Sequence, residues 1–277
     1  MELPSSLSIF AVDVGRPKKL GWARRCGANR SVGQDAQHLA DAMAHDARAR
    51  LSIALGFECP LFLPIAKEPL NLLSARCGEH DRSWSASAGA SATTAGIVTL
   101  SWVFRRFAES VGTVPSLFSD WDCFSQSREL YKVFVWEAFV SKRLKKLKDV
   151  LGIPPEEAKW KTKEGMHINF DKADALTAVD AFQDSFGQPT DVHVKPGCSV
   201  FSIVHAVVAS LGWDTTGVPT DMPSLVRKRT KPDWNVVPRM LSEVGDQAEC
   251  NVREWFVAQP ASSNRSKGHT GPTKATN

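Results

Sequence analysis

Apolar residues occur in two kinds of run, which predict alternating strands and helices. Three short runs are almost continuously apolar, as in strands that are buried on both faces; they are residues 7–14, 51–58 and 131–139. Other segments repeat apolar residues every three or four positions, which is typical of amphipathic helices; they are residues 35–50, 90–111 and a segment that starts at Asp171. The chain is therefore expected to alternate between strand and helix.

The residues between these runs predict how the elements connect. Gly15 and Pro17 favour a turn after the first run, so residues 7–25 are expected to form a hairpin. A loop rich in proline and serine is expected after Pro60, and residues 199–211 are expected to form a last helix. This order predicts an α/β fold, with a mixed sheet and helices on both faces.

Composition sets the size and the surroundings of the domain. The chain has 277 residues, of which 43% are hydrophobic, and its net charge of +4 does not by itself indicate a nucleic-acid-binding protein. Residues 1–235 are expected to form one domain with a C-terminal extension, and residues 236–277 a poorly structured to disordered tail.

Three further features favour a cytoplasmic protein without a membrane partner. No apolar run reaches the ~18 residues of a membrane span. The N-terminal residues lack the basic segment of a signal peptide. The six cysteines are scattered without a C-x-x-C pair, so we expect reduced thiols.

Five carboxylates stand at positions where a metal site can form. Asp13, Glu58 and Glu137 each lie near the C-terminal end of a predicted strand, which is the edge where open α/β sheets place their sites. Asp171 and Asp174 are three residues apart, on one face of the start of a helix. Carboxylates repel one another, whereas Mg²⁺ and Mn²⁺ bind oxygen ligands from several elements. The pattern therefore predicts a divalent metal site.

Each acid also has a structural explanation. Asp13 and Glu58 can pair with nearby basic residues, and Glu137 can serve inside the fold. Asp171 is favourable at a helix N-terminus through the helix dipole. Asp174, among apolar positions of a core-facing helix, is the hardest of them to explain as structure alone.

Three short motifs resemble a known family. The segment "FAVDVGRPKKLGWA" is similar to the first hairpin of ribonuclease H-like nucleases, particularly the RuvC-type Holliday-junction resolvases, with Asp13 as the first catalytic acid. "ALGFECP" is similar to the strand that carries a catalytic glutamate, here Glu58. "FDKADALTAV" is similar to the helix with the last acids, here Asp171 and Asp174. The motifs keep the family's chain order over residues 7–185, and the set also resembles uncharacterised bacterial proteins predicted to be nucleases of this fold.

This resemblance implies a ribonuclease H-like sheet and a nuclease that hydrolyses phosphodiester bonds with two Mg²⁺ or Mn²⁺ ions. Asp13 would bridge the two ions, Glu58 and Asp174 would each hold one, and Asp171 would assist. Glu137 and His167 are auxiliary candidates. Glu137 lies on a strand where the family needs no acid. His167 is able to orient a water molecule or a leaving group, and an ordinary loop histidine is the alternative. The resolvases act as dimers, so a homodimer is compatible with the resemblance. The choice between DNA and RNA stays open.

Basic residues are expected to contact phosphates, which gives salt-dependent binding without sequence preference. The candidates are Lys18 and Lys19 in the first hairpin and Lys142, Arg143, Lys145 and Lys146 after the third strand, with a further basic stretch at residues 226–231. A solvated basic helix face is the ordinary explanation for such clusters.

Two other functions fit parts of the pattern. A catalytically inactive ribonuclease H-fold protein that binds nucleic acid or another partner would keep the basic clusters and lack metal dependence. An actin-like or sugar-kinase-type ATPase also opens with D-x-G and a hairpin. Such an ATPase needs a second similar half, which the sequence lacks, and the chain has no G-x-x-x-x-G-K-[ST] loop.

Overall fold

The structure of the protein is a computed structural model. It describes residues 6–15, 20–77, 79, 83–140, 160–161, 167–168, 170–184 and 198–229. The residues of the expected tail, 236–277, lie outside this part, so the tail stays a prediction.

Strands and helices are interspersed along the chain. The strands are β1 (Leu7–Asp13), β2 (Gly21–Cys26), β3 (Asn29–Gly33), β4 (Ser52–Phe57), β5 (Phe62–Ala66), β6 (Ser116–Phe118), β7 (Lys132–Val140), β8 (Trp160–Lys161), β9 (His167–Ile168), β10 (Cys198–Ser202) and β11 (Leu225–Arg229). The helices are α1 (Ala36–Arg48), the 3-10 turn η2 (Pro69–Asn71), α2 (Ser87–Val111), α3 (Trp121–Gln126), α5 (Phe170–Asp184) and α6 (Ile203–Ser210). Among the described residues no helix is both long and apolar enough to cross a membrane, α2 included.

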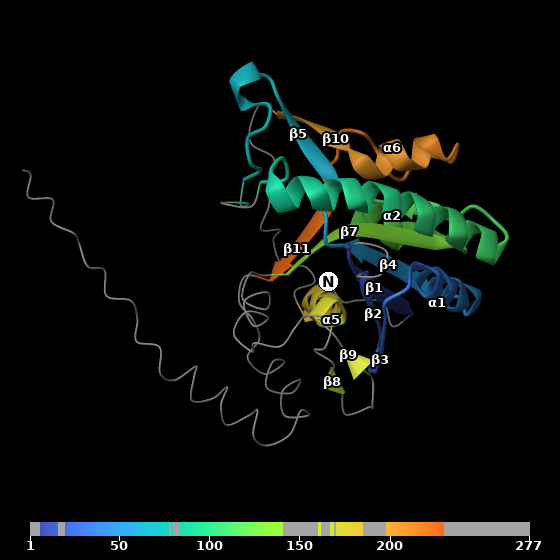
Figure 1. Ribbon diagram of the computed structural model, residues 1–277. Coiled ribbons are helices and arrows are strands. Elements are labelled where there is room, and N and C mark those ends of the chain that lie inside the picture. Colours follow the sequence, from blue (N-terminus) through green and yellow to red (C-terminus); the bar gives the residue numbers. More distant parts are fainter. Residues whose placement is uncertain are drawn as a thin grey trace, which may run out of the picture.

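A mixed sheet forms the centre of the fold. It has seven strands in the order β11-β7-β4-β1-β2-β3, and β6 pairs with β7. β2 runs antiparallel to its neighbours β1 and β3, whereas β4 runs parallel to β1 and is followed outward by the parallel strands β7 and β11. Helices α1, α2 and α6 lie on one side of this sheet and α5 lies on the other (Figure 1). The predicted α/β class, with a mixed sheet and helices on both faces, is confirmed.

Alternation along β1 separates two hydrophobic cores. Phe10 and Val12 pack with the residues of α1, α2 and α6. Ile9 and Ala11 point the opposite way and pack with α5. Because successive side chains of a strand point to opposite faces, the next residue on the α5 side is Asp13. The side chains of β4 and β7 alternate between the two faces in the same way. The pairing register of β1, β4 and β7 therefore decides which side chains lie next to one another on each face.

An ion-pair cluster holds α5 against the first three strands. Asp180, a buried residue of α5, accepts hydrogen bonds from Arg25 of β2 at 2.6 Å and Arg30 of β3 at 2.9 Å. Both arginines share one carboxylate oxygen, which ties the helix to two strands at once. Since Asp174 lies on the same helix, this cluster also helps to orient the candidate site.

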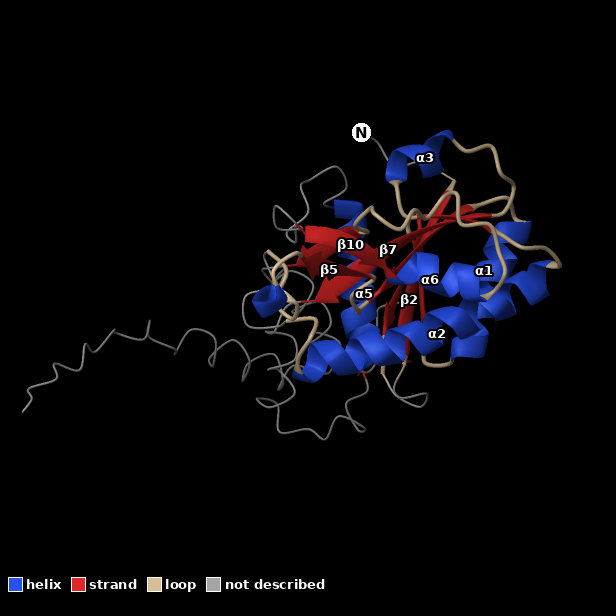
Figure 2. Ribbon diagram, turned by 90° about the horizontal axis from the view of Figure 1, so that it is seen from above, coloured by secondary structure: helices blue, strands red, loops and turns tan. Residues whose placement is uncertain are grey.

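The last expected helix is only partly correct. Residues 198–202 form β10, and the helix α6 begins at Ile203. β10 pairs antiparallel with β5, a strand in the segment that was expected to be a loop. The two strands lie side by side, at the end of the molecule away from α1 (Figure 2). A short apolar run has the same pattern in a strand and in a buried helix. Residues 198–202 form a strand because they pair with β5.

We expect the Asp180→Asn variant to lose about 2–3 kcal/mol of unfolding free energy, because it leaves two arginines without their carboxylate partner. Urea unfolding followed by circular dichroism measures the loss. Asp184→Asn, on an exposed position of the same helix, is the control and should stay within about 0.5 kcal/mol of the wild type. Equal stability of the two variants would show that the cluster does not anchor α5.

Candidate metal centre

The parallel ladder between β1 and β4 brings Asp13 and Glu58 together. Asp13 is the last residue of β1, on the face toward α5. Glu58 directly follows β4, and its backbone N–H donates to the carbonyl of Val12 at 2.8 Å. This bond continues the ladder by one step beyond the strand. Two carboxylates therefore stand side by side at the C-terminal edge of neighbouring parallel strands.

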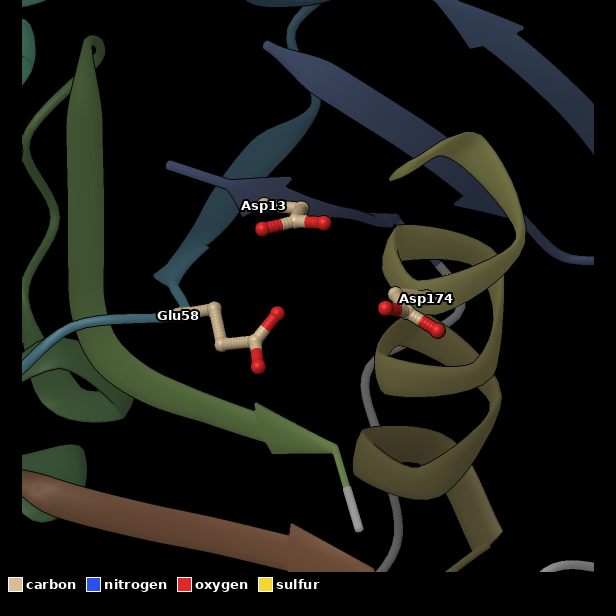
Figure 3. A group of neighbouring side chains, drawn as sticks. All are labelled: Asp13, Glu58 and Asp174. Carbon is tan, nitrogen blue, oxygen red and sulfur yellow. The ribbon is translucent and has the colours of Figure 1, made fainter. Parts of the chain in front are cut away.

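The third carboxylate comes from the helix above this edge. Asp174 lies in the first half of α5 and is buried, with Ala175 and Leu176 next to it in the core beneath the helix. One oxygen each of Asp13, Glu58 and Asp174 can be chosen so that all three lie within 4.8 Å of one another. Figure 3 shows the three carboxylates directed toward a common space between β1, the segment after β4, and α5. This arrangement suits the oxygen ligands of divalent cations.

Burial increases the mutual repulsion of these acids. The exposed fraction is 8% for Glu58 and 2% for Asp174, while Asp13 is partly exposed. Like charges that share a partly dry site destabilise one another, because little solvent separates them. A divalent cation reverses the sign of this interaction. The donor set, which consists of carboxylates alone, fits Mg²⁺ or Mn²⁺ better than a softer metal.

Two aromatic rings pack together on the α5 face of the sheet, which also carries the carboxylates. Gly56, two residues before Glu58 on the same face, pairs with Trp136 of β7. A Cβ atom at Gly56 would lie 2.4 Å from the Trp136 indole, so only glycine leaves room for that ring. The indole in turn contacts the ring of Phe182 of α5, with 4.6 Å between the ring centroids. This part of the α5 face is therefore closely packed and apolar.

Glu137 lies on the opposite face of the sheet from this cluster. One of its carboxylate oxygens accepts from the Arg76 guanidinium at 2.8 Å, from the backbone N–H of Leu61 at 2.7 Å and from that of Phe62 at 3.3 Å. These bonds hold the segment that directly follows Glu58. Glu137 therefore contacts the chain segment behind the carboxylates, and its auxiliary role stays a prediction.

Arg76 connects Glu137 to a second acid that the sequence did not single out. It donates to Glu79 through its Nε at 2.8 Å, and its guanidinium carbon lies 4.3 Å from the ring centroid of Phe62. Burial acts to lower the pKa of Arg76, but Glu137 and Glu79 together raise it above its usual value. Burial also raises the pKa of Glu137, against the effect of Arg76. No local pattern marks Arg76, because its partners are distant in the chain or inside a loop.

Cys59 is not a suitable nucleophile, although it follows Glu58 directly. Burial raises its pKa well above that of an ordinary thiol, and the charges of Glu137 and Glu58 raise it further, against Arg76. A protonated thiol is a poor nucleophile and a poor metal ligand. Its sulfur packs closely against Gly96 of α2, where a Cβ atom would lie 2.3 Å away. Cys59 therefore contributes to the core.

Several predicted site residues lie partly or wholly outside the described part of the chain. Asp171 belongs to α5, one helical turn before Asp174, and His167 belongs to β9, but their side chains are not described. The candidate phosphate contacts Lys18, Lys19, Lys142, Arg143, Lys145 and Lys146 lie outside the described residues. Their roles stay predictions.

Comparison of the chain with protein-family models, with curated proteins and with solved structures gives no match. Assignment of a function therefore depends on the geometry and chemistry of the site.

We expect Glu137→Gln to lower the unfolding free energy by about 3 kcal/mol, because it removes one of two carboxylates from a fully buried arginine. The glutamine oxygen can still accept from the backbone of Leu61 and Phe62, so the loss reports mainly on the charge. Urea unfolding measures it. Glu109→Gln is the control, since Glu109 forms an ion pair with Arg106 on the surface and such pairs contribute at most about 1 kcal/mol. A similar loss in both variants would contradict the prediction.

Proposed function

We propose that this protein is a divalent-metal-dependent nuclease with a ribonuclease H-like fold, which hydrolyses phosphodiester bonds in nucleic acid. The observation that carries the proposal is the convergence of Asp13, Glu58 and Asp174, from two parallel strand ends and a helix, within 4.8 Å. This edge of an open α/β sheet is where such folds place their sites. The motifs around these acids resemble those of RuvC-type resolvases, which supports the same function.

The three carboxylates would bind the metal from three different elements of the fold. Glu58 approaches from the end of β4, Asp174 from α5, and Asp13 from the strand beside Glu58 (Figure 3). Two bound Mg²⁺ or Mn²⁺ ions would stabilise the attacking and leaving oxygens and lower the pKa of the attacking water. The protein's own contribution is a rigid set of ligands: the β1–β4 ladder and the Glu137 bonds fix Glu58, while Asp180 and its arginines orient α5.

The proposed partner is therefore nucleic acid. A cytoplasmic location and a homodimer stay predictions of the sequence. The competing functions are separated by measurement: a binding module would not need metal, and an ATPase would bind nucleotide.

The direct test is cleavage of end-labelled RNA, DNA, RNA–DNA hybrid and four-way-junction substrates with Mg²⁺ or Mn²⁺. We expect cleavage of at least one of them, and a loss of more than about a hundredfold in Asp13→Asn, Asp174→Asn and chelator-treated protein, because each change removes metal ligation. Asp122→Asn, at an exposed acid of α3, should retain full activity. Cleavage that persists in Asp13→Asn would contradict the proposed site.

Metal binding is also measurable without a substrate. We expect Mg²⁺ or Mn²⁺ to raise the melting temperature of the wild type, since an ion at a hundred times its Kd adds about 2.7 kcal/mol. Asp13→Asn should gain little on adding metal, because it has lost a carboxylate ligand. If no metal effect and no cleavage are found, a non-catalytic binding module becomes the better explanation.

A further inference from the structure

The register of the sheet places an arginine in the same row as the carboxylates. The ladder between β4 and β7 pairs Phe57 with Glu137, so the next step sets Glu58 beside Ala138. Ala138 is paired with Arg227 of β11. Continuing from β1 outward, the row is therefore Asp13, Glu58, Ala138 and Arg227.

Arg227 points toward the α5 side of the sheet, as the carboxylates do. Its neighbour Leu225 packs against the core beneath α5, whereas Val226 packs with Phe62 on the other face. Alternation along β11 then directs Arg227 to the α5 face. The residue is 6% exposed, and α5 packs over β11 as well as over β1 and β7. Figure 3 shows β11 beyond β7, on the Glu58 side of the site.

The distance along this row suits a direct role in the site. Two strand spacings separate Glu58 from Arg227, which is roughly 10 Å between Cα atoms. The residue between them is Ala138, whose side chain is a single methyl group. A guanidinium keeps its charge when it is buried. Arg227 therefore brings a fixed positive charge close to the carboxylate cluster.

We propose that Arg227 is a phosphate-binding residue of the site, which holds the scissile or the adjacent phosphate on the Glu58 side. The inference depends on the proposed nuclease function and adds a residue to it. A planar guanidinium can present two parallel N–H donors to the oxygens of a phosphate, a geometry that lysine cannot reproduce. The same positive charge also weakens the attraction of the carboxylates for cations, which gives Arg227 an effect on metal affinity.

The test compares Arg227→Gln and Arg227→Lys with the wild type in two measurements: Mn²⁺ affinity by calorimetry, and kcat/KM for the labelled nucleic acid that is cleaved fastest. Arg227→Gln should lower kcat/KM at least about a hundredfold and tighten Mn²⁺ binding several-fold. Arg227→Lys keeps the charge, so its Mn²⁺ affinity should stay within about twofold while kcat/KM falls about tenfold. Arg105→Gln, at an exposed position of α2 on the other side of the sheet, should change neither quantity.

The outcomes separate this inference from the proposed function. Wild-type protein that binds no Mn²⁺ would overturn both. Wild-type binding and cleavage together with an unchanged Mn²⁺ affinity and kcat/KM in Arg227→Gln would overturn only the role of Arg227. If Arg227→Gln does not fold, as judged by circular dichroism, Arg227→Lys decides: wild-type kcat/KM in that variant would overturn the role. A fall in kcat/KM in Arg227→Lys at unchanged Mn²⁺ affinity is not expected from a merely structural arginine, because lysine keeps the charge and loses the planar fork.

Discussion

Electrostatic repulsion among three clustered carboxylates is the constraint on which the rest of this structure depends. Asp13, Glu58 and Asp174 approach one another within 4.8 Å at a site that is largely buried. Such proximity costs free energy unless positive charge from the protein or from a bound cation offsets it, and a rigid fold is needed to hold the acids in place. The fold provides rigidity from both sides, through the β1–β4 ladder below the acids and the attachment of α5 above them.

A second charge network lies behind the first, on the other face of the sheet. Glu137 accepts from Arg76 and from the backbone just beyond Glu58, so a buried ion pair stabilises the segment that carries a candidate metal ligand. The backbone of the sheet separates the two networks, and in the second network Arg76 offsets part of the charge of Glu137 and Glu79. Within the described part of the chain, the group of acids that could hold a cation is the one on the α5 face. Buried charge therefore serves structure on one face and the proposed chemistry on the other.

The apolar surroundings of the site increase the effect of every charge in it. Trp136 packs against Phe182 on the same face of the sheet as the carboxylates, and Gly56 permits this packing. In such a low-dielectric environment the interaction of carboxylates with a cation, and of Arg227 with a phosphate, is stronger than in water. The same row of the sheet would then contribute the metal ligands Asp13 and Glu58 and the phosphate contact Arg227.

The sequence by itself determined the local features of this protein. Apolar runs and their periods are properties of neighbouring residues, so they predicted β1, β4, β7 and the helices α1, α2 and α5, and they placed acids at the strand ends. The tertiary structure decided which of these acids meet. Glu58 and Glu137 look alike in the sequence, yet the register directs them to opposite faces of the sheet. Arg76, the pairing of β5 with β10, and the place of Arg227 in the row also depend on contacts between distant segments, which no local pattern encodes.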